Sequence, residues 1–247
     1  MNMNTSIHLM TSGGLKTSAT FYSTQNRNSY FNMTKKNFLN RIRLYILISS
    51  NIATKSVKQT ARLVIDGGAD AIQLREKTIS DSEFITLAGE VREITTRSGT
   101  ILIINDRVHV AREINADGVH LGQQDMSVLE ARDIIGKNKI IGVSTHSIMQ
   151  AKQAQKDGAD YIAIGPIYPT KTKDYEPSIG IKVIQELSGA VNIPIIAIGA
   201  ITLKNLDEVL KAGASRVAAC SAIIGSKDIY SSTKQYKEKL NGTQTHG

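Results

Sequence analysis

Three polar side chains alternate along one short apolar segment and could bind an anionic ligand. Gln73, Arg75 and Lys77 are separated by Leu74 and Glu76. Because successive side chains of a β-strand point to opposite faces, an extended segment places the three polar residues on one face. Burying two cations is costly unless anions meet them, so this face predicts a phosphate or diphosphate ligand. The alternative is a structural ion pair between Arg75 and Glu76 or a neighbouring acid.

Two carboxylates at the ends of neighbouring apolar segments could share a divalent cation. Asp106 follows Asn105 at the end of one segment, and Asp125 comes shortly after the next. Adjacent strands of a sheet lie roughly 5 Å apart, so both carboxylates can reach one ion. Carboxylate oxygens without nearby His or Cys suit Mg²⁺, which completes its shell with water and substrate phosphate. Alternatively, each aspartate caps the helix expected after it.

Ser144 ends a further apolar segment, directly after Gly142 and Val143. The sequence G-x-S-x-G is absent here, so Ser144 is not a nucleophile of that type. We expect a hydrogen-bonding serine, with a simple helix cap as the alternative. His120 and His146 lack metal-ligand spacing, and we interpret both as structural.

Two regions later in the sequence carry groups that could bind phosphate. The loop after the sixth apolar segment carries three of the four prolines together with Thr170, Lys171, Thr172 and Lys173. Long loops in compact barrels are usually functional, and these hydroxyl and ammonium groups can donate to phosphate oxygens. Solvated charge is the alternative. The last two apolar segments end in Gly199-Ala200 and Cys220-Ser221, which predicts a second anion site.

Short apolar runs alternate with amphipathic stretches of helical spacing from residue 44 onward, which predicts βα units and a parallel sheet. The expected strands are 44–49, 71–76, 101–106, 118–122, 139–145, 161–165, 194–200 and 216–221. Helices are expected near 56–66, 81–98, 108–114, 127–136, 147–157, 179–188, 203–211 and 228–240.

An internal repeat supports a closed barrel. The tripeptides that begin at Gly68, Asn115, Gly158 and Gly213 each precede an even-numbered strand, so two βα units fill each interval. Eight units in about 200 residues fit a single (β/α)₈ TIM barrel over residues 44–247. An open doubly wound sheet is the alternative. In a barrel, the polar strand ends described above lie together at the carboxyl-terminal rim.

Composition excludes several classes of protein. The chain has 247 residues with 41% hydrophobic and 21% charged residues, and it has no run near the roughly 18 apolar residues of a membrane span. The net charge of +8 arises largely from residues 1–43, which contain six of the 30 basic residues and none of the 22 acidic ones. The rest is nearly neutral, which argues against nucleic acid as a partner.

Residues 1–43 read as a disordered basic leader, rich in Asn, Ser and Thr. They fit an organellar transit peptide, or upstream sequence before a start at Met33. A single cysteine, Cys220, excludes intramolecular disulfides and fits a reducing compartment, so we expect a cytoplasmic protein, with organellar import left open.

Five motifs together resemble the thiamine-phosphate synthase family. In chain order they are Gln73–Lys77, Asn105-Asp106, Ala116–Asp125, Gly142–Ser144 and Gly165–Lys173. Each is weak alone, but all five occur in the family's order at successive strand ends. The resemblance covers residues 44 to 240 and implies small-molecule substrates: a hydroxymethylpyrimidine diphosphate is coupled to a thiazole phosphate, giving thiamine phosphate and diphosphate.

The resemblance also implies roles for individual residues. By resemblance, the residues that bind the pyrimidine diphosphate are Gln73, Leu74, Arg75, Glu76, Lys77, Asn105, Ser144 and Lys173. Arg75, Ser144 and Lys173 are the catalytic candidates among them. The residues implied to bind the thiazole phosphate are Thr170, Lys171, Thr172, Ala200, Cys220 and Ser221. Mg²⁺ is implied to bind Asp106 and Asp125. The implied mechanism is dissociative: the bond to diphosphate breaks first and the thiazole nitrogen then attacks.

Two positions depart from the family pattern. Ala200 stands where the family usually has a second glycine, so its methyl group is expected to crowd the phosphate or strain a backbone with positive φ. Cys220 replaces a more usual aliphatic residue. Two other functions remain, namely a thiazole tautomerase-like barrel and a non-catalytic barrel that binds thiamine phosphate. The sequence also leaves a homo-oligomer open.

Overall fold

The structure is a computed structural model, and it describes residues 35–170 and 177–242. These residues contain eight parallel strands that form one closed barrel in sequential order, β1 to β8. The strands are β1 (Leu44–Ile48), β2 (Ala71–Leu74), β3 (Ile101–Asn105), β4 (Gly118–Leu121), β5 (Ile140–Thr145), β6 (Tyr161–Ile164), β7 (Ile195–Ala197) and β8 (Val217–Ala219). The predicted TIM barrel is confirmed, and the open sheet is excluded.

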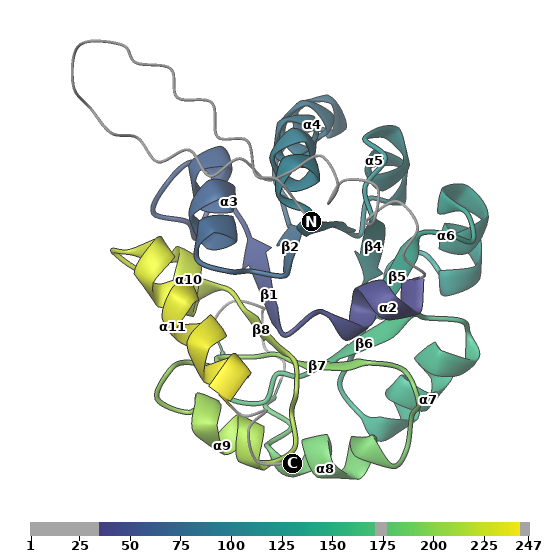
Figure 1. The fold of residues 1–247 in the computed structure, drawn as a ribbon. Coiled ribbons are helices and arrows are strands. Elements are labelled where there is room, and N and C mark those ends of the chain that lie inside the picture. The colour runs from purple at the N-terminus through teal and green to yellow at the C-terminus, as the bar shows by residue number, and fades with distance from the viewer. Residues whose placement is uncertain (1–34, 171–176, 243–247) are drawn as a thin grey trace, which may run out of the picture. The chain divides into compact units, whose positions relative to one another are not determined.

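Helices surround the strands as an outer layer (Figure 1). They are α3 (Val57–Asp66), α4 (Asp81–Ser98), α5 (Val108–Glu113), α6 (Val128–Ile135), α7 (Ile148–Lys156), α8 (Lys182–Ser188), α9 (Leu206–Lys211), α10 (Ser221–Ile224) and α11 (Ile229–Gly242). Local sequence fixes several helix starts. Ser80 with Glu83, and Ser127 with Glu130, form capping boxes at α4 and α6. Among the described helices, none combines the length and apolar character needed to cross a membrane.

Alternation along each strand divides the apolar core into two layers. Leu44, Ile46 and Ile48 of β1 pack outward against the helices. Tyr45 and Leu47 point into the barrel. The outer layer ties the helices to the sheet, and the inner layer fills the lower barrel beneath the carboxyl-terminal rim.

The helix α2 (Lys35–Asn40) lies within the segment expected to be a disordered leader. Its Leu39, together with the following Ile42, is buried against the inner core layer. Lys35 also forms an ion pair of 2.7 Å with Asp160. For residues 35–43 the expectation of disorder is therefore wrong, because two apolar side chains cover the amino-terminal end of the barrel. The remainder of the predicted leader, residues 1–34, lies outside the described residues.

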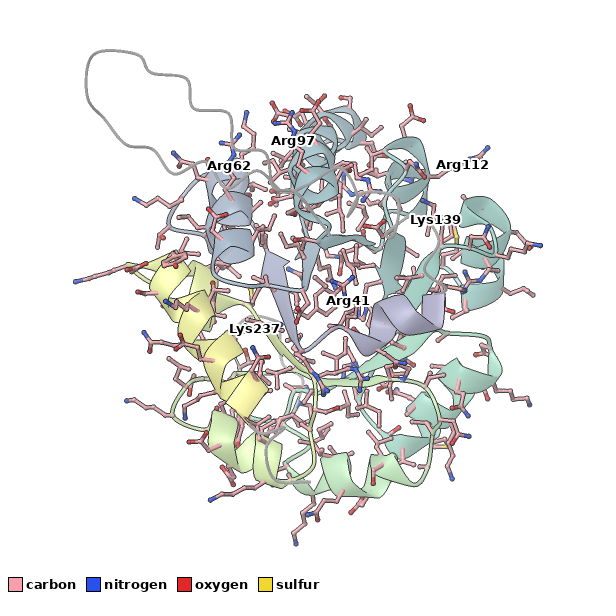
Figure 2. All side chains as sticks on the ribbon, in the orientation of Figure 1. Arg41, Arg62, Arg97, Arg112, Lys139 and Lys237 are labelled. Atoms are coloured by element: carbon pink, nitrogen blue, oxygen red, sulfur yellow. The ribbon has the colours of Figure 1, made fainter. Side chains whose placement is uncertain are left out.

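The repeated tripeptides have a second role that their glycines did not reveal. Asp70, Asp117 and Asp160 end three of the four, and each carboxylate accepts a backbone N–H at the start of the preceding odd-numbered strand, at 2.8–2.9 Å. Each also pairs with a basic side chain. These are Lys237 on α11 for Asp70 (labelled in Figure 2), Arg92 for Asp117, and Arg132 with Lys35 for Asp160. The fourth tripeptide ends in Ser215, and β7 and β8 share only the pair Ala197 and Val217.

Candidate active site

A cavity at the carboxyl ends of the strands contains many of the residues expected from the sequence. Its walls come from β1 to β8 and from the loops that follow them. The predicted site residues that line it are Gln73, Arg75, Asn105, Ser144, Thr170, Ala200, Cys220 and Ser221. The structure therefore brings these eight together at one rim, as a barrel requires.

β2 supplies the cation of this cavity. Gln73 points into the barrel and donates a 2.9 Å hydrogen bond to the Tyr45 hydroxyl. Arg75 comes two residues after Gln73, on the same face of the chain, and lines the cavity. Glu76 accepts instead from the Ser50 backbone N–H at 2.7 Å and from the Ser50 hydroxyl at 2.6 Å. Arg75 forms no ion pair with any described acid, so its interpretation as half of a structural ion pair is wrong.

Leu74 and Glu76 do not line the cavity. Leu74 is fully buried in the outer core layer, because its side chain points away from the barrel interior. Glu76 is 4% exposed and is occupied by Ser50. The two side chains hold the strand and the following loop in place, while their neighbours Gln73 and Arg75 face the cavity.

Asp106 lies at the end of β3 and pairs with Lys77. Its backbone has a φ of 51°, and its N–H donates to the carbonyl of His120 on β4 at 2.9 Å. Its carboxylate does not cap α5, since the residue before that helix is Arg107 and no side chain caps the helix there. The capping interpretation of Asp106 is therefore wrong.

Asp125 folds back onto its own loop, where its Oδ2 accepts the Gly122 N–H at 2.6 Å. It does not cap α6, because Ser127 takes that position with Glu130. Asp125 does not line the main cavity. It stands after β4, next to the strand that Asp106 follows.

The donor chemistry of Asp106 and Asp125 fits Mg²⁺. Within the described ranges there is no group of three or more His, Cys, Asp or Glu that could hold a metal. Mg²⁺ does not require one, because it takes one or two carboxylates and completes its shell with water and substrate phosphate. The carboxylate of Asp106 already holds one cation, the ammonium group of Lys77, and so has the charge and access that a metal ligand needs.

Ser144 does not cap a helix, because α7 is capped by Ser147. Its hydroxyl lies 2.9 Å from Nε2 of His120, and its carbonyl accepts from Gln123 at 2.6 Å. His120 is 5% exposed and lines the cavity, as does His146. The interpretation of both histidines as structural did not foresee that they line the cavity. For His120, the alternation of side chains between the two faces of β4 could have indicated this position.

The loop after β6 approaches the cavity with Gly165, Pro166 and Thr170. Tyr168 in the same loop donates a 2.8 Å hydrogen bond to Glu208 on α9. Burial, followed by this contact with Glu208, raises the pKa of Tyr168 to about 12. The predicted residues Lys171, Thr172 and Lys173 lie outside the described residues.

The ends of β7 and β8 form the next part of the cavity wall. Gly199 has a φ of 111°, and a Cβ there would lie 2.4 Å from Cα of Pro166, so only glycine fits. Ala200 follows with a φ of 47°, which confirms that its methyl group sits on a backbone with positive φ. Burial raises the pKa of Cys220 to about 11, while the nearby charge of Arg75 lowers it. The charge of Arg75 therefore reaches the residue that follows β8.

The fold and the site together define a (β/α)₈ barrel with a cavity at the carboxyl ends of its strands, lined by apolar and polar residues that include Arg75. The family described as thiamine monophosphate synthase matches residues 44–223. A thiamine-phosphate synthase of Chloroflexus aurantiacus is 42% identical over 204 residues, which cover 82% of this chain and 94% of that protein. A second, of Clostridium tetani, is 40% identical over 200 residues, which cover 81% of this chain and 94% of that protein.

A solved structure agrees with these relatives. The thiamine phosphate pyrophosphorylase of Pyrococcus furiosus superposes with a TM-score of 0.78 and 33% identity, covering 84% of this chain and all of that one. This chain belongs to the thiamine monophosphate synthase family.

Proposed function

We propose that this protein is a thiamine-phosphate synthase. It would transfer the pyrimidine of 4-amino-2-methyl-5-(diphosphooxymethyl)pyrimidine to 4-methyl-5-(2-phosphooxyethyl)thiazole, giving thiamine phosphate and diphosphate. Arg75 carries the proposal, because it is a cation in the cavity wall that forms no ion pair with a described acid. A diphosphate is the kind of ligand that repays the desolvation of such a group. The two relatives described above are both named thiamine-phosphate synthase.

The chain's own side chains suit a reaction in which the bond to diphosphate breaks before the thiazole nitrogen attacks. Negative charge grows on the departing diphosphate, so Arg75, Lys77 and Lys173 stabilise the transition state more than the ground state. Gln73, Asn105 and Ser144 orient the pyrimidine through hydrogen bonds. The thiazole nitrogen carries its own lone pair, so the site needs no general base.

Asp106 and Asp125 would hold Mg²⁺ in this proposal. When bound there, the ion would supply positive charge that neutralises the diphosphate. Lys77 pairs with Asp106, so its ammonium group lies beside a carboxylate that would hold the ion.

The test incubates the full chain with both substrates and measures thiamine phosphate and diphosphate, with Mg²⁺ and with a chelator. We expect both products in equal amounts, only when both substrates and Mg²⁺ are present. Conversion of the thiazole phosphate alone would indicate a tautomerase. Tight binding of thiamine phosphate without turnover would indicate a sensor. Either result would overturn the proposal.

Variants refine this test. Asp106→Ala and Lys173→Ala are each expected to lower turnover at least about tenfold with the fold intact. Asp66→Ala, which removes an exposed carboxylate at the end of α3, is the matched control and should leave turnover unchanged. Near-normal rates for the first two variants would refute those assignments.

We also propose that the protein works in the cytoplasm, since its one cysteine fits a reducing compartment. Organellar import through residues 1–43 is the alternative. Imaging the full chain with a carboxyl-terminal fluorescent tag, beside a version that starts at Met33, distinguishes the two: an organellar signal lost on truncation would contradict the proposal.

A further inference from the structure

A continuous chain of hydrogen bonds runs through the inside of the barrel. Gln73 donates to the Tyr45 hydroxyl at 2.9 Å, and that hydroxyl lies 3.0 Å from the hydroxyl of Tyr161. The Tyr161 hydroxyl lies 2.9 Å from Nδ1 of His120, whose Nε2 lies 2.9 Å from the Ser144 hydroxyl. Gln73 and Ser144, at the two ends, line the cavity, whereas Tyr161, in the middle, does not. Tyr161 therefore influences the cavity only through its neighbours.

The ring of Tyr161 is held in a fixed place. It is 1% exposed and packs edge-on against Tyr45, with ring centroids 6.1 Å apart. Gly142 of β5 also contacts the phenol, since a Cβ there would lie 2.0 Å from Cζ and 2.4 Å from the hydroxyl oxygen of Tyr161. The absence of a side chain at position 142 thus makes the space that the phenol fills.

The direction of the hydrogen bonds follows from counting hydrogens. The Gln73 amide nitrogen has only hydrogens to offer, so the Tyr45 oxygen accepts there. The single hydrogen of Tyr45 then has only the Tyr161 oxygen as an acceptor among the described residues. Tyr161 in turn gives its hydrogen to Nδ1 of His120. The reverse direction would leave the hydrogen of a buried tyrosine without an acceptor, which is costly.

Counting hydrogens also gives the direction of the bond at the Ser144 end of the chain. A neutral imidazole that accepts at Nδ1 carries its hydrogen on Nε2, so His120 donates to the oxygen of Ser144. The hydroxyl of Ser144 accepts that bond and keeps its own hydrogen for a partner in the cavity. A chain in which each hydroxyl accepts one bond and donates one is also the arrangement in which neighbouring bonds strengthen each other.

We propose that Tyr161 is a positioning residue that fixes His120 as the Nε2–H tautomer, and that Ser144 therefore acts as a hydrogen-bond donor toward the substrate. The tautomer follows from this chain of hydrogen bonds and does not rest on the proposed function. The identity of the acceptor rests on the proposed function: an acceptor atom of the pyrimidine diphosphate, either a ring nitrogen or a phosphate oxygen, faces Ser144.

The first experiment uses the full wild-type chain without substrate, labelled with ¹⁵N in histidine. Long-range ¹H–¹⁵N spectra separate protonated from unprotonated ring nitrogens, and the His120→Asn variant assigns the signals. We expect the hydrogen of the neutral His120 ring on Nε2. A hydrogen on Nδ1 would overturn the proposal. This result does not depend on activity, so it stands or falls separately from the proposed function.

The second experiment removes one oxygen atom with Tyr161→Phe. We expect His120 to lose its single tautomer and kcat to fall about tenfold, while KM for the thiazole phosphate stays within about twofold. Thr233→Val is the matched control, since it deletes a fully buried hydroxyl on α11, far from the chain of bonds, and should change neither signal nor kcat. An unchanged His120 spectrum in folded Tyr161→Phe would overturn the role of Tyr161.

Thermal unfolding followed by circular dichroism shows whether the variant folds. Should Tyr161→Phe fail to fold, Tyr45→Phe provides the same test one step further along. It removes the hydrogen that Tyr161 accepts, and we expect a mixture of His120 tautomers. A single Nε2–H tautomer in Tyr45→Phe would show that His120 is fixed by something other than this chain.

Discussion

The two ends of the barrel use charged side chains in opposite ways. At the amino-terminal end, Asp70, Asp117 and Asp160 each bind a basic side chain and the backbone of a strand. At the carboxyl-terminal end, Arg75 faces a cavity and forms no ion pair with a described acid. The three carboxylates at the amino-terminal end are therefore neutralised within the fold. The charge of Arg75 is instead available to an anionic ligand in the cavity.

This difference separates stability from function within one scaffold. Three related carboxylates tie β1, β3 and β5 in place, so the opposite rim can carry a cation such as Arg75 that forms no ion pair with a described acid. Removing a charge from the amino-terminal end should therefore cost folding free energy but little activity. Removing a charge from the carboxyl-terminal end should do the reverse.

The largest effect is expected for Arg75→Met. It removes the cation that meets the diphosphate, so kcat/KM should fall by about 100- to 1000-fold. The free energy of unfolding should stay within about 1 kcal/mol or rise, because the variant no longer desolvates a cation that forms no ion pair with a described acid. Steady-state kinetics and urea titration measure the two quantities.

Arg97→Met is the control for this variant. Arg97 lies on α4 with 81% of its side chain exposed, and Figure 2 labels it on the outside of the barrel. The control should leave both quantities unchanged. A loss of several kcal/mol of stability in Arg75→Met, with activity retained, would mean that Arg75 belongs to the structural group instead.

Asp117→Ala should produce the opposite result. It leaves Arg92 without its 2.7 Å ion pair and the Leu102 N–H without its 2.8 Å acceptor. We expect the free energy of unfolding to fall by about 3 kcal/mol. Well below the unfolding temperature, kcat should not change. Asp117→Asn keeps an acceptor for the backbone and should lose only about 1 kcal/mol.

The reactivity of Cys220 is a measure of the charge of Arg75, because both residues line the cavity and that charge acts on the pKa of the thiol. Burial raises the pKa of this thiol from 9.0 to about 11, so its alkylation by iodoacetamide near pH 8 should be about 100-fold slower than that of an unperturbed thiol. Arg75 favours the thiolate. Arg75→Met should therefore raise the pKa of Cys220 further and slow alkylation again, measured by mass spectrometry. Faster alkylation would show that Arg75 shields the thiol physically.

The sequence predicted the barrel and the carboxyl-terminal rim because both follow from local patterns. Strand alternation placed Gln73 and Arg75 inward, and the order of the strands placed Ser144 and Cys220 on the same rim. These inferences need only the period of a strand and the geometry of a parallel barrel. Family resemblance added the substrates, which no periodicity could supply.

The sequence could not predict contacts between distant segments. The link from Tyr45 to Tyr161 joins residues 116 positions apart, and either tyrosine alone is an ordinary core residue. The carboxylate of Asp160 binds Lys35, 125 positions away, within a segment whose composition indicated disorder. Such pairings depend on barrel closure, which brings together strands whose sequences carry no mark of their partners.

The smallest effect is expected where the repeat is incomplete. Ser215 replaces the aspartate of the other three tripeptides, next to Arg43 and Arg216, which donate to its carbonyl and hydroxyl at 3.1 and 3.0 Å. Burial and then the charge of Arg43 lower the pKa of Arg216. Ser215→Asp gives both guanidinium groups a carboxylate and should raise the free energy of unfolding by about 0.5–1 kcal/mol, with kcat unchanged.

The pH dependence of this gain identifies its cause. A carboxylate between two cations has a folded-state pKa below its unfolded value of about 3.9, so the gain is present above that value and is lost as the pH falls through the folded pKa. Salt should also weaken it. Ser215→Asn, which has nearly the same shape without the charge, should give no gain. Equal stabilisation by both variants would show that packing between β7 and β8, and not charge, limits this last repeat.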